Sequence, residues 1–471
     1  MAVDELCWMS ATELAGAIKR KQVSPLEVID AVLARIEKLN PTLNAYCTVT
    51  AEAARREARA AERALMKRGA KLGRLHGVPF SIKDLIITKG VRTTWGTRLY
   101  ADHVPEEDAP IVARLKAAGG ILVGKTNTPM FGWIGATHNL LFGATRSPWN
   151  LDRTPGGSSG GAGAAVAAGM APLAVGTDGG GSIRIPASFS GIFGLKPSYG
   201  RVPIHPPSAA WSLSHAGPMT RTVADAALML NVLAGPDERD QYSLPAPGVD
   251  YVKALKGSLK GLRVGWTSTL GFAKVVDPEI AAIAERAARG FKHFGCRVDG
   301  VDPRFPDPSP AWDAIFCGGI AARLKPYFPD RRADIDEGLV RIIEDTLTWP
   351  PTKYIQAWFE RLAFWEPVRK FFETYDLLLT PTVACPPFKV GLDNPAVIAG
   401  TPIEPYGWIP FTYPFNMTGQ PAASVPCGFT SDGLPIGLQI VGRRFDDATV
   451  LRAAATFEEA HPWAGKKPPI A

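Results

Sequence analysis

Two dense clusters of glycine and serine constrain this chain more than any other feature of its sequence. The first is GGSSGG at Gly156–Gly161 and the second is GGGS at Gly179–Ser182, with a short buried strand expected between them at Leu173–Asp178. Glycine costs backbone entropy and adds no side chain to a core, so dense clusters are typical of linkers. Apolar, well-patterned segments flank both clusters here, and linkers lack such segments. The clusters therefore predict a place where backbone N–H groups approach another group closely.

A nucleophile fits that place. Three glycines before Ser182 leave several backbone N–H donors around one hydroxyl, which is the arrangement of an oxyanion hole beside its nucleophile. A serine hydroxyl attacks only if a base takes its proton. Lys83 lies in the apolar run Val78–Ile87, and burial disfavours the charged ammonium, so this lysine can serve as the base. Ser182 as nucleophile, Ser158 as relay and Lys83 as base form a chemically complete set.

The run GGSSGG followed by GTDGGGSIRIPASFSGIFGLKPS resembles the signature of the amidase signature family. The resemblance covers most of the chain, through GVPFSIKD around Lys83, KTN at Lys125–Asn127 and NMTGQPAASVPCG near the end. It implies a Ser–cis-Ser–Lys triad in which Ser182 attacks a carbonyl and Ser158, on a cis peptide bond, passes the proton to Lys83. It also implies an oxyanion hole formed by four backbone N–H groups, those of Gly179, Gly180, Gly181 and Ser182.

Several further residues receive supporting roles from the same resemblance. Asp178 and Arg184 are expected to form a buried ion pair that holds the nucleophile loop, and such a pair is costly to break on one side only. Ser159 and Thr177 are expected to support the triad.

Two titratable residues are interpreted from the sequence itself. Asp84 either helps to position Lys83 or the signature loop, or lies in a solvated turn, and the sequence leaves both open because strand alternation points Asp84 away from Lys83. None of the seven histidines stands at a triad or metal spacing, so His215 is interpreted as structural.

A substrate pocket is expected in two aromatic regions. Phe131 and Trp133 lie just before the signature, and Trp312 and Cys317 lie in a segment of about residues 304–372 that is rich in proline and aromatic residues. The resemblance implies that this segment is a helical insertion that caps the substrate. The alternative is that Phe131 and Trp133 are core residues and that 304–372 is a helical layer that packs its aromatic side chains on the core.

A phosphate-binding motif also occurs and is rejected. Gly119–Thr126 matches G-x-x-x-x-G-K-[ST], but its inner residues are Ile, Leu and Val, which favour a strand. A helix should begin at Lys125, and Asn127-Thr128-Pro129 follows instead.

Composition indicates no nucleic-acid or membrane partner. The net charge of +7 is modest for 471 residues, and the strongest basic cluster, around Arg55, Arg56, Arg59 and Arg63, is typical of a solvated helix face. Six cysteines without a CxxC pair indicate reduced thiols rather than disulfides or a metal site. Acidic residues stand at positions 4 and 5, where a signal peptide would be basic. We therefore expect a cytoplasmic protein that uses no metal and no cofactor.

Strands alternate with helices along the chain, which predicts an α/β fold with a mixed central sheet covered by helices on both faces. We expect a single domain over 1–471, with N-terminal helices at about 10–70 that begin at the capping boxes Ser10–Glu13 and Ser24–Glu27. In the family, such helices sometimes make dimer contacts, which leaves a homodimer open.

The expected function is hydrolysis of a carboxylic amide with an apolar or aryl group, giving a carboxylate and ammonia or an amine through an acyl-enzyme. Two alternatives stay open. One is the glutaminase (A) subunit of a tRNA-dependent amidotransferase, and the other is hydrolysis of cyclic amide oligomers, carbamates or hydrazides on the same scaffold.

Overall fold

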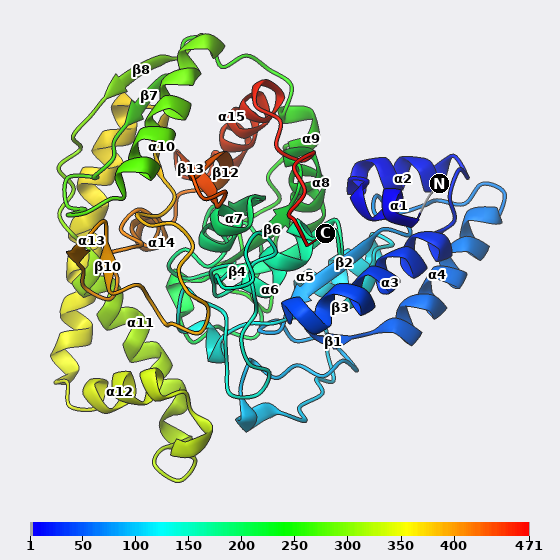
Figure 1. Ribbon diagram of the computed structural model, residues 1–471, viewed down its shortest axis with the longest axis horizontal. Helices are drawn as coiled ribbons and strands as arrows, with labels where there is room; N and C mark the ends of the chain where they lie inside the picture. The colour runs from blue at the N-terminus through cyan, green and yellow to red at the C-terminus, as the bar shows by residue number, and fades with distance from the viewer. Residues whose placement is uncertain (1–2, 471) are drawn as a thin grey trace.

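The computed structural model describes residues 3–470 and is built on one mixed sheet of 11 strands (Figure 1). Parallel pairs lie toward both ends of the sheet, and antiparallel pairs join the strands between them. In spatial order the strands are β1 (Tyr46–Val49), β3 (Ile121–Thr126), β2 (Pro79–Lys83), β4 (Leu173–Asp178), β6 (His215–Thr220), β5 (Phe193–Lys196), β12 (Ala422–Phe429), β13 (Pro435–Gly442), β9 (Leu377–Pro381), β7 (Arg263–Trp266) and β8 (Arg297–Gly300). A separate ribbon pairs β10 (Val397–Ile398) with β11 (Thr401–Pro402).

The two faces of the sheet carry different hydrophobic cores. In β9, Leu377 and Leu379 join one cluster and Leu378 joins another, because alternate strand residues point to opposite faces. The neighbouring strand β12 divides in the same way, with Ala423 in the first cluster and Ala422 in the second. The predicted mixed sheet with helices on both faces is therefore confirmed.

Helices divide between these two cores. In the described chain, nine contribute buried residues to the first cluster and to neither of the others: α1 (Val3–Trp8), α2 (Ala11–Lys19), α3 (Pro25–Leu43), α4 (Ala51–Met66), α5 (Pro110–Ala117), α8 (Val223–Leu233), α9 (Tyr251–Ala254), α10 (Pro278–Gly290) and α15 (Asp447–Ala460). The second cluster is built on α11 (Ser309–Leu324), α12 (Glu337–Thr346), α13 (Pro351–Thr374) and α14 (Pro414–Thr418). Two central helices, α6 (Gly160–Ala167) and α7 (Arg184–Ser190), meet across a third, smaller cluster.

The N-terminal helices begin where their capping signals predict. In α3, the Ser24 side chain accepts from the Glu27 N–H while the Glu27 carboxylate accepts from the Ser24 N–H. Val28, Val32 and Ile36 then repeat every four residues and are buried against the sheet. A second capping box opens α2 at Ser10, as predicted.

Some elements escaped prediction because their sequences carry weak signals. The strands β1, β5 and β8 have only four residues each, and β6 reads HAGPMT, in which glycine and proline disfavour a strand. The rejection of the phosphate-loop motif is confirmed, because its residues from Ile121 to Thr126 form the buried strand β3. In this strand Lys125 Nζ donates to Ile86 O at 2.7 Å and to Thr93 Oγ1 at 2.6 Å.

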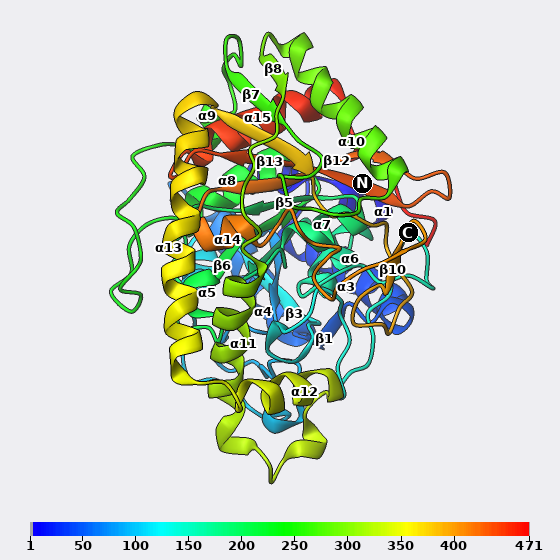
Figure 2. The same ribbon diagram turned by 90° about the vertical axis from the view of Figure 1, so that its left-hand side faces the viewer.

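The aromatic segment of about 304–372 folds into α11, α12 and α13. Figure 2 shows the long α13 running beside α11, with α12 across one end of the pair. Many of its aromatic side chains are core, because Trp312, Phe316, Phe364 and Phe372 are buried in the second cluster.

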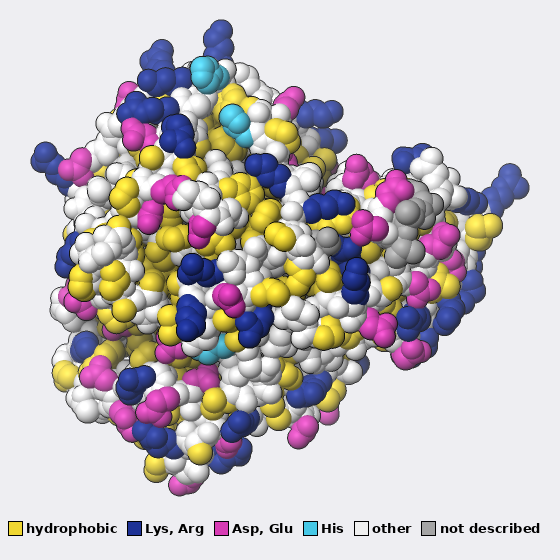
Figure 3. All heavy atoms as spheres, in the orientation of Figure 1, with side chains coloured by type: hydrophobic (Ala, Val, Ile, Leu, Met, Phe, Trp, Pro, Cys, Tyr) yellow, Lys and Arg dark blue, Asp and Glu magenta, His cyan; other side chains and the backbone are white. Residues whose placement is uncertain are grey.

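Charged side chains of both signs are interspersed over the surface, as the face in Figure 3 shows. On α4, Arg56, Arg59 and Arg63 are exposed, and Arg55 pairs with Asp30 at 2.8 Å, which confirms a solvated helix face. None of the helices within residues 3–470 combines the length and apolar character that a membrane crossing needs.

We expect Leu379→Ala to lower the free energy of unfolding by about 2–5 kcal/mol, because Leu379 is fully buried where β9 packs on β13 and β7. Leu347→Ala is the matched control, since this leucine is 47% exposed, and should change the free energy by less than about 0.5 kcal/mol. Thermal unfolding of the two variants measures the difference, and equal melting temperatures would contradict this account of the core.

Candidate active site

Lys83 ends the buried strand β2 and points its ammonium at three hydroxyls. Its Nζ lies 2.7 Å from Ser158 Oγ, 2.9 Å from Ser159 Oγ and 2.9 Å from Thr177 Oγ1. The side chain has no solvent exposure, and no carboxylate of residues 3–470 lies within ion-pair distance of it. Burial lowers the pKa of Lys83 well below its usual value of 10.5, against a smaller opposing effect of the more distant Asp178.

A neutral Lys83 satisfies this geometry with two N–H donors and one lone pair. Ser159 Oγ already donates to Thr177 O at 3.2 Å and accepts from the Thr177 N–H at 3.2 Å, so it accepts from the lysine. Ser158 Oγ has no other hydrogen-bond partner in the described chain, so its proton is free to point at the lysine lone pair. Of the two serines in contact with Lys83, Ser158 is therefore the one that can exchange a proton.

Close backbone packing fixes Ser158 beside the lysine. The peptide bond between Gly157 and Ser158 is cis. A Cβ on Gly157 would meet Ala136 O at 2.3 Å, and a Cβ on Gly132 would meet Ser158 Oγ at 3.0 Å. Only glycine fits at Gly157, and Gly132 gives the Ser158 hydroxyl its open side.

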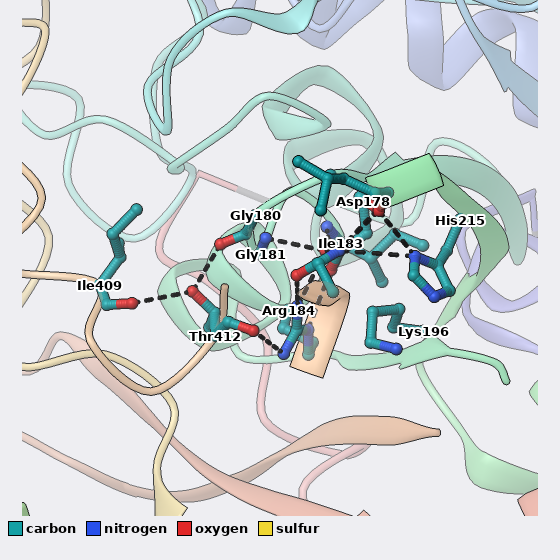
Figure 4. Close-up of polar contacts among 12 residues, drawn as sticks. Asp178, Gly180, Gly181, Ile183, Arg184, Lys196, His215, Ile409 and Thr412 are labelled. Carbon is teal, nitrogen blue, oxygen red and sulfur yellow. Dashed lines mark hydrogen bonds and ion pairs between the residues drawn. The ribbon is translucent and has the colours of Figure 1, made fainter. Parts of the chain in front are cut away.

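The segment 179–183, here called the nucleophile loop, is held by a buried ion pair (Figure 4). Arg184 donates to both carboxylate oxygens of Asp178, at 2.8 and 2.9 Å, and both side chains are fully buried. Burial alone would raise the pKa of Asp178, but Arg184 and the Asn416 amide hold it below its usual value. Asp178 also accepts from the backbone N–H groups of Gly181 at 2.8 Å and Ile183 at 3.2 Å.

Two carbonyls of the nucleophile loop accept hydrogen bonds from side chains outside the loop. Thr412 Oγ1 donates to Gly180 O at 2.6 Å, and Trp312 Nε1 donates to Gly179 O at 2.9 Å. With the carbonyls turned away, the N–H groups of Gly179, Gly180 and Ser182 have no acceptor among the described residues. The Gly181 N–H belongs to Asp178, so three donors remain free where the sequence implied four.

Ser182 is half-buried and lines a cavity beside the loop. Its hydroxyl makes no hydrogen bond with any residue from 3 to 470. The contact between Lys83 and Ser158 is thus formed, and the contact between Ser158 and Ser182 is not.

The cavity at Ser182 has a volume of about 550 Å³, and its lining is mainly apolar. Trp133, Trp312 and Cys317 line it, together with Gly180 of the nucleophile loop. Such a site buries the apolar body of a small molecule next to a hydroxyl and free N–H donors.

The family model described as Amidase matches residues 27–451 of this chain. The chain belongs to the amidase signature family. It is 41% identical over 473 residues to an acylamidase of Rhodococcus erythropolis, covering 99% of this chain and 98% of that protein. It is also 41% identical over 493 residues to the glutamyl-tRNA(Gln) amidotransferase A-subunit of Moorella thermoacetica, covering 99% of each.

A solved relative in the amidase signature family, a bacterial aryl acylamidase, superposes with a TM-score of 0.91 at 37% identity, covering 98% of this chain and 99% of that one. The 6-aminohexanoate cyclic dimer hydrolase bound to its substrate superposes with a TM-score of 0.89 at 32% identity, with the same coverage. Amide hydrolysis is therefore the chemistry of this amidase signature enzyme.

Phe131 does not lie where the sequence placed it. Its φ is +50°, its N–H donates to Trp95 O at 2.8 Å, and its ring stacks on Trp95 at 5.9 Å. This backbone turn sends the side chain into a second cavity of about 80 Å³, which also reaches Thr177 and Leu85. The expectation that Phe131 lines the pocket with Trp133 is wrong for the cavity at Ser182.

Asp84 is fully buried, so the solvated-turn alternative is wrong. Its carboxylate accepts from the Thr94 N–H at 2.9 Å and from the Thr94 hydroxyl at 2.5 Å, and it lies 3.5 Å from Lys125 Nζ. These contacts fasten the chain that leaves Lys83 to Thr94 and, through Lys125, to the neighbouring strand β3, which supports a role in positioning the lysine.

His215 is buried under the nucleophile loop, as the structural interpretation predicts. Burial, and then the nearby Lys196, lower the pKa of His215 well below its usual value, so the ring is neutral. Its Nδ1 donates to Leu213 O at 2.9 Å. No group of three or more His, Cys, Asp or Glu side chains in the described part of the chain is arranged to hold a metal ion.

Sequence reasoning missed residues that contact the site from far along the chain. Asn416 donates to Asp178 Oδ1 at 2.8 Å, and Thr412 holds Gly180. Both lie in or beside the stretch NMTGQ, which the family resemblance marked, and their buried polar side chains in an apolar run were the available signal. Asp313 and Tyr406, which line the cavity, carried no such signal.

We expect Arg184→Met to destabilise the fold by about 3–5 kcal/mol, because it leaves the Asp178 carboxylate buried without its cation. Arg289→Met is the control, since this arginine pairs with Glu285 on an exposed helix face and should cost less than about 1 kcal/mol. Denaturant unfolding distinguishes the two variants, and similar midpoints would show that the buried pair does not hold the loop.

Proposed function

We propose that this protein is an amidase that cleaves a carboxylic amide with Ser182 as nucleophile, Ser158 as proton relay and Lys83 as base. The observation that carries the proposal is the contact of 2.7 Å between Lys83 Nζ and Ser158 Oγ, made by a lysine that is fully buried and has no carboxylate partner in the described chain. An uncharged amine with its lone pair on a hydroxyl is a base at neutral pH.

In acylation, Ser182 Oγ bonds to the amide carbonyl carbon and gives its proton to Ser158, which gives its own proton to Lys83. Substrate binding brings the Ser182 hydroxyl onto Ser158, since that contact is open beforehand. The oxygen that becomes negative lies at the N–H groups of Gly179, Gly180 and Ser182, which form the proposed oxyanion hole. Asp178 and Arg184 hold the loop in shape throughout.

The intermediate then collapses and the C–N bond breaks. The departing nitrogen takes a proton from Ser158, which recovers one from Lys83, and the acyl group stays on Ser182. Water attacks this ester through the same relay and releases the carboxylate. The chain's own residues supply every proton transfer in this scheme.

The proposed substrate has an apolar or aryl group, because Trp133, Trp312 and Trp408 line the cavity at Ser182. The helices of residues 304–372 supply one wall of that cavity, which supports the substrate-capping role. Six free cysteines in the described chain support a cytoplasmic location.

The glutaminase subunit of an amidotransferase is the second candidate, supported by the 41% identity to the Moorella thermoacetica protein. The structural likeness favours the amidase, because the aryl acylamidase superposes at a TM-score of 0.91 and the Thermotoga maritima glutamyl-tRNA(Gln) amidotransferase A-subunit at 0.78. Assays of the pure protein with acyl anilides and with glutamine separate the two, and faster turnover of glutamine would favour the second.

We expect Lys83→Ala, Ser158→Ala and Ser182→Ala each to lower kcat for an acyl anilide by at least about a thousandfold, because the three residues act as a unit. Ser159→Ala should lower it about tenfold or less, since Ser159 donates to a backbone carbonyl and accepts from the Thr177 N–H and the lysine, and so passes on no proton. Lys89→Ala, an exposed lysine nearby, is the control. Equal losses for the two serines next to Lys83 would contradict the assignment of Ser158 as relay.

We expect kcat/KM to rise with pH and to level off well below pH 10.5. The base form of Lys83 is the neutral amine, and burial lowers its pKa from 10.5, so the active form is present above the lowered pKa and is lost as pH falls through it. The profile is measured with an amide that does not itself ionise. A tenfold rise per pH unit that continues to pH 10.5 would show an ordinary, charged lysine.

A further inference from the structure

The cavity at Ser182 carries more negative than positive charge, although the whole chain has a net charge of +7. Three carboxylates and one guanidinium line it: Asp313, Asp345, Asp393 and Arg341. Asp393 pairs with His138 at 3.0 Å, and Asp345 is exposed at the rim. Asp313 is half-buried, and no cation between residues 3 and 470 lies within ion-pair distance of it.

The contacts of Asp313 leave one of its oxygens free. Oδ1 accepts from the Tyr406 hydroxyl at 2.8 Å and from the Cys317 thiol at 3.1 Å. Burial, and then Asp313 itself, raise the pKa of Cys317 well above its usual value, so the thiol stays a donor. Oδ2 accepts from nothing in the described chain and is open to the cavity.

A carboxylate in this position is stabilised most by a cation. Partial burial without a counter-charge costs free energy, which a bound cation with an N–H donor offsets. Aromatic rings stand around the same place: Trp312 stacks on Phe316 at 4.8 Å and meets Tyr406 edge-on at 5.0 Å. Ring faces attract cations as well, and more strongly where water is excluded.

The position of Asp313 is fixed relative to the nucleophile. Asp313 follows Trp312 on α11, and the indole of Trp312 donates to Gly179 O in the nucleophile loop at 2.9 Å. A Cβ on Gly180 would meet the Trp312 ring at 2.5 Å, so loop and helix are in contact. A ligand group at Asp313 is therefore held at a set distance from Ser182.

We propose that Asp313 binds an ammonium group of the substrate, and that the substrates are amides whose apolar or aryl body ends in a primary amine away from the bond that is cleaved. This inference rests on the proposed amidase function. Tyr406 and Cys317 are positioning residues, because they hold Oδ1 and leave Oδ2 to the ligand.

The test measures binding in the Ser182→Ala background, where hydrolysis does not interfere. The probes are anilides of short ω-aminoalkanoic acids, each paired with the anilide in which a methyl group replaces the ammonium group, and N-benzoyl diaminoalkanes paired with N-benzoyl alkylamines. We expect the ammonium member of at least one series to bind about ten- to a hundredfold more tightly, as a charge-assisted hydrogen bond provides. Asp313→Asn should reduce that preference to about onefold, while binding of the methyl member stays unchanged and reports an intact fold.

Asp345→Asn is the matched control, because it removes the same charge from the exposed rim and should keep the preference. Equal binding of both members in both series, or a preference that survives Asp313→Asn, would overturn the inference. Hydrolysis by the unaltered Ser182 enzyme tests the proposed function separately. Tight binding of the ammonium series without turnover would leave Asp313 as the cation site and remove the amidase assignment.

Discussion

The structure of the site depends on the desolvation of one lysine. Lys83 ends a central strand with no solvent exposure and three hydroxyl neighbours, and the described chain gives it no counter-charge within ion-pair distance. Water or a carboxylate at this point would favour the ammonium form, which cannot accept a proton. The residue after Lys83 is a carboxylate, Asp84, but it lies against Lys125 and not against Lys83. The fold thus separates a paired buried lysine from an unpaired one.

A second constraint is the shape of the nucleophile loop, which is set by polar groups from distant parts of the chain. Asp178 and Arg184 lie inside the signature, while Thr412 reaches it from the loop before α14, Asn416 from α14 and Gln439 from β13. Their contacts occupy loop carbonyls and the Gly181 N–H, and the N–H groups of Gly179, Gly180 and Ser182 are left without an acceptor in the described chain. A flexible glycine loop becomes a fixed set of donors because each buried polar group around it is satisfied.

Much of the site could be predicted from the sequence, because glycine clusters that flank apolar segments and a lysine in an apolar strand are both costly unless chemistry requires them. The strand at Leu173–Asp178, both capping boxes and the rejection of the phosphate loop followed from local signals. Phe131 was misplaced because its positive φ is set by packing against Trp95, which no local pattern encodes. The strand β6 was not predicted because its glycine and proline disfavour a strand. The contacts of Asp313 could not be predicted either, because they depend on α11 packing beside the loop that carries Tyr406, about ninety residues later in the chain.

The central claim is that Lys83 is uncharged in the folded enzyme at neutral pH, and NMR of lysine labelled with carbon-13 at Cε tests it most directly. Lys83→Arg assigns the signal, and Lys125→Arg and Lys196→Arg identify the other two fully buried lysines. The account predicts that the Lys83 Cε shift is that of a neutral amine at pH values where exposed lysines, with pKa near about 10.4, are still charged. A Lys83 signal that titrates together with the exposed lysines would contradict it.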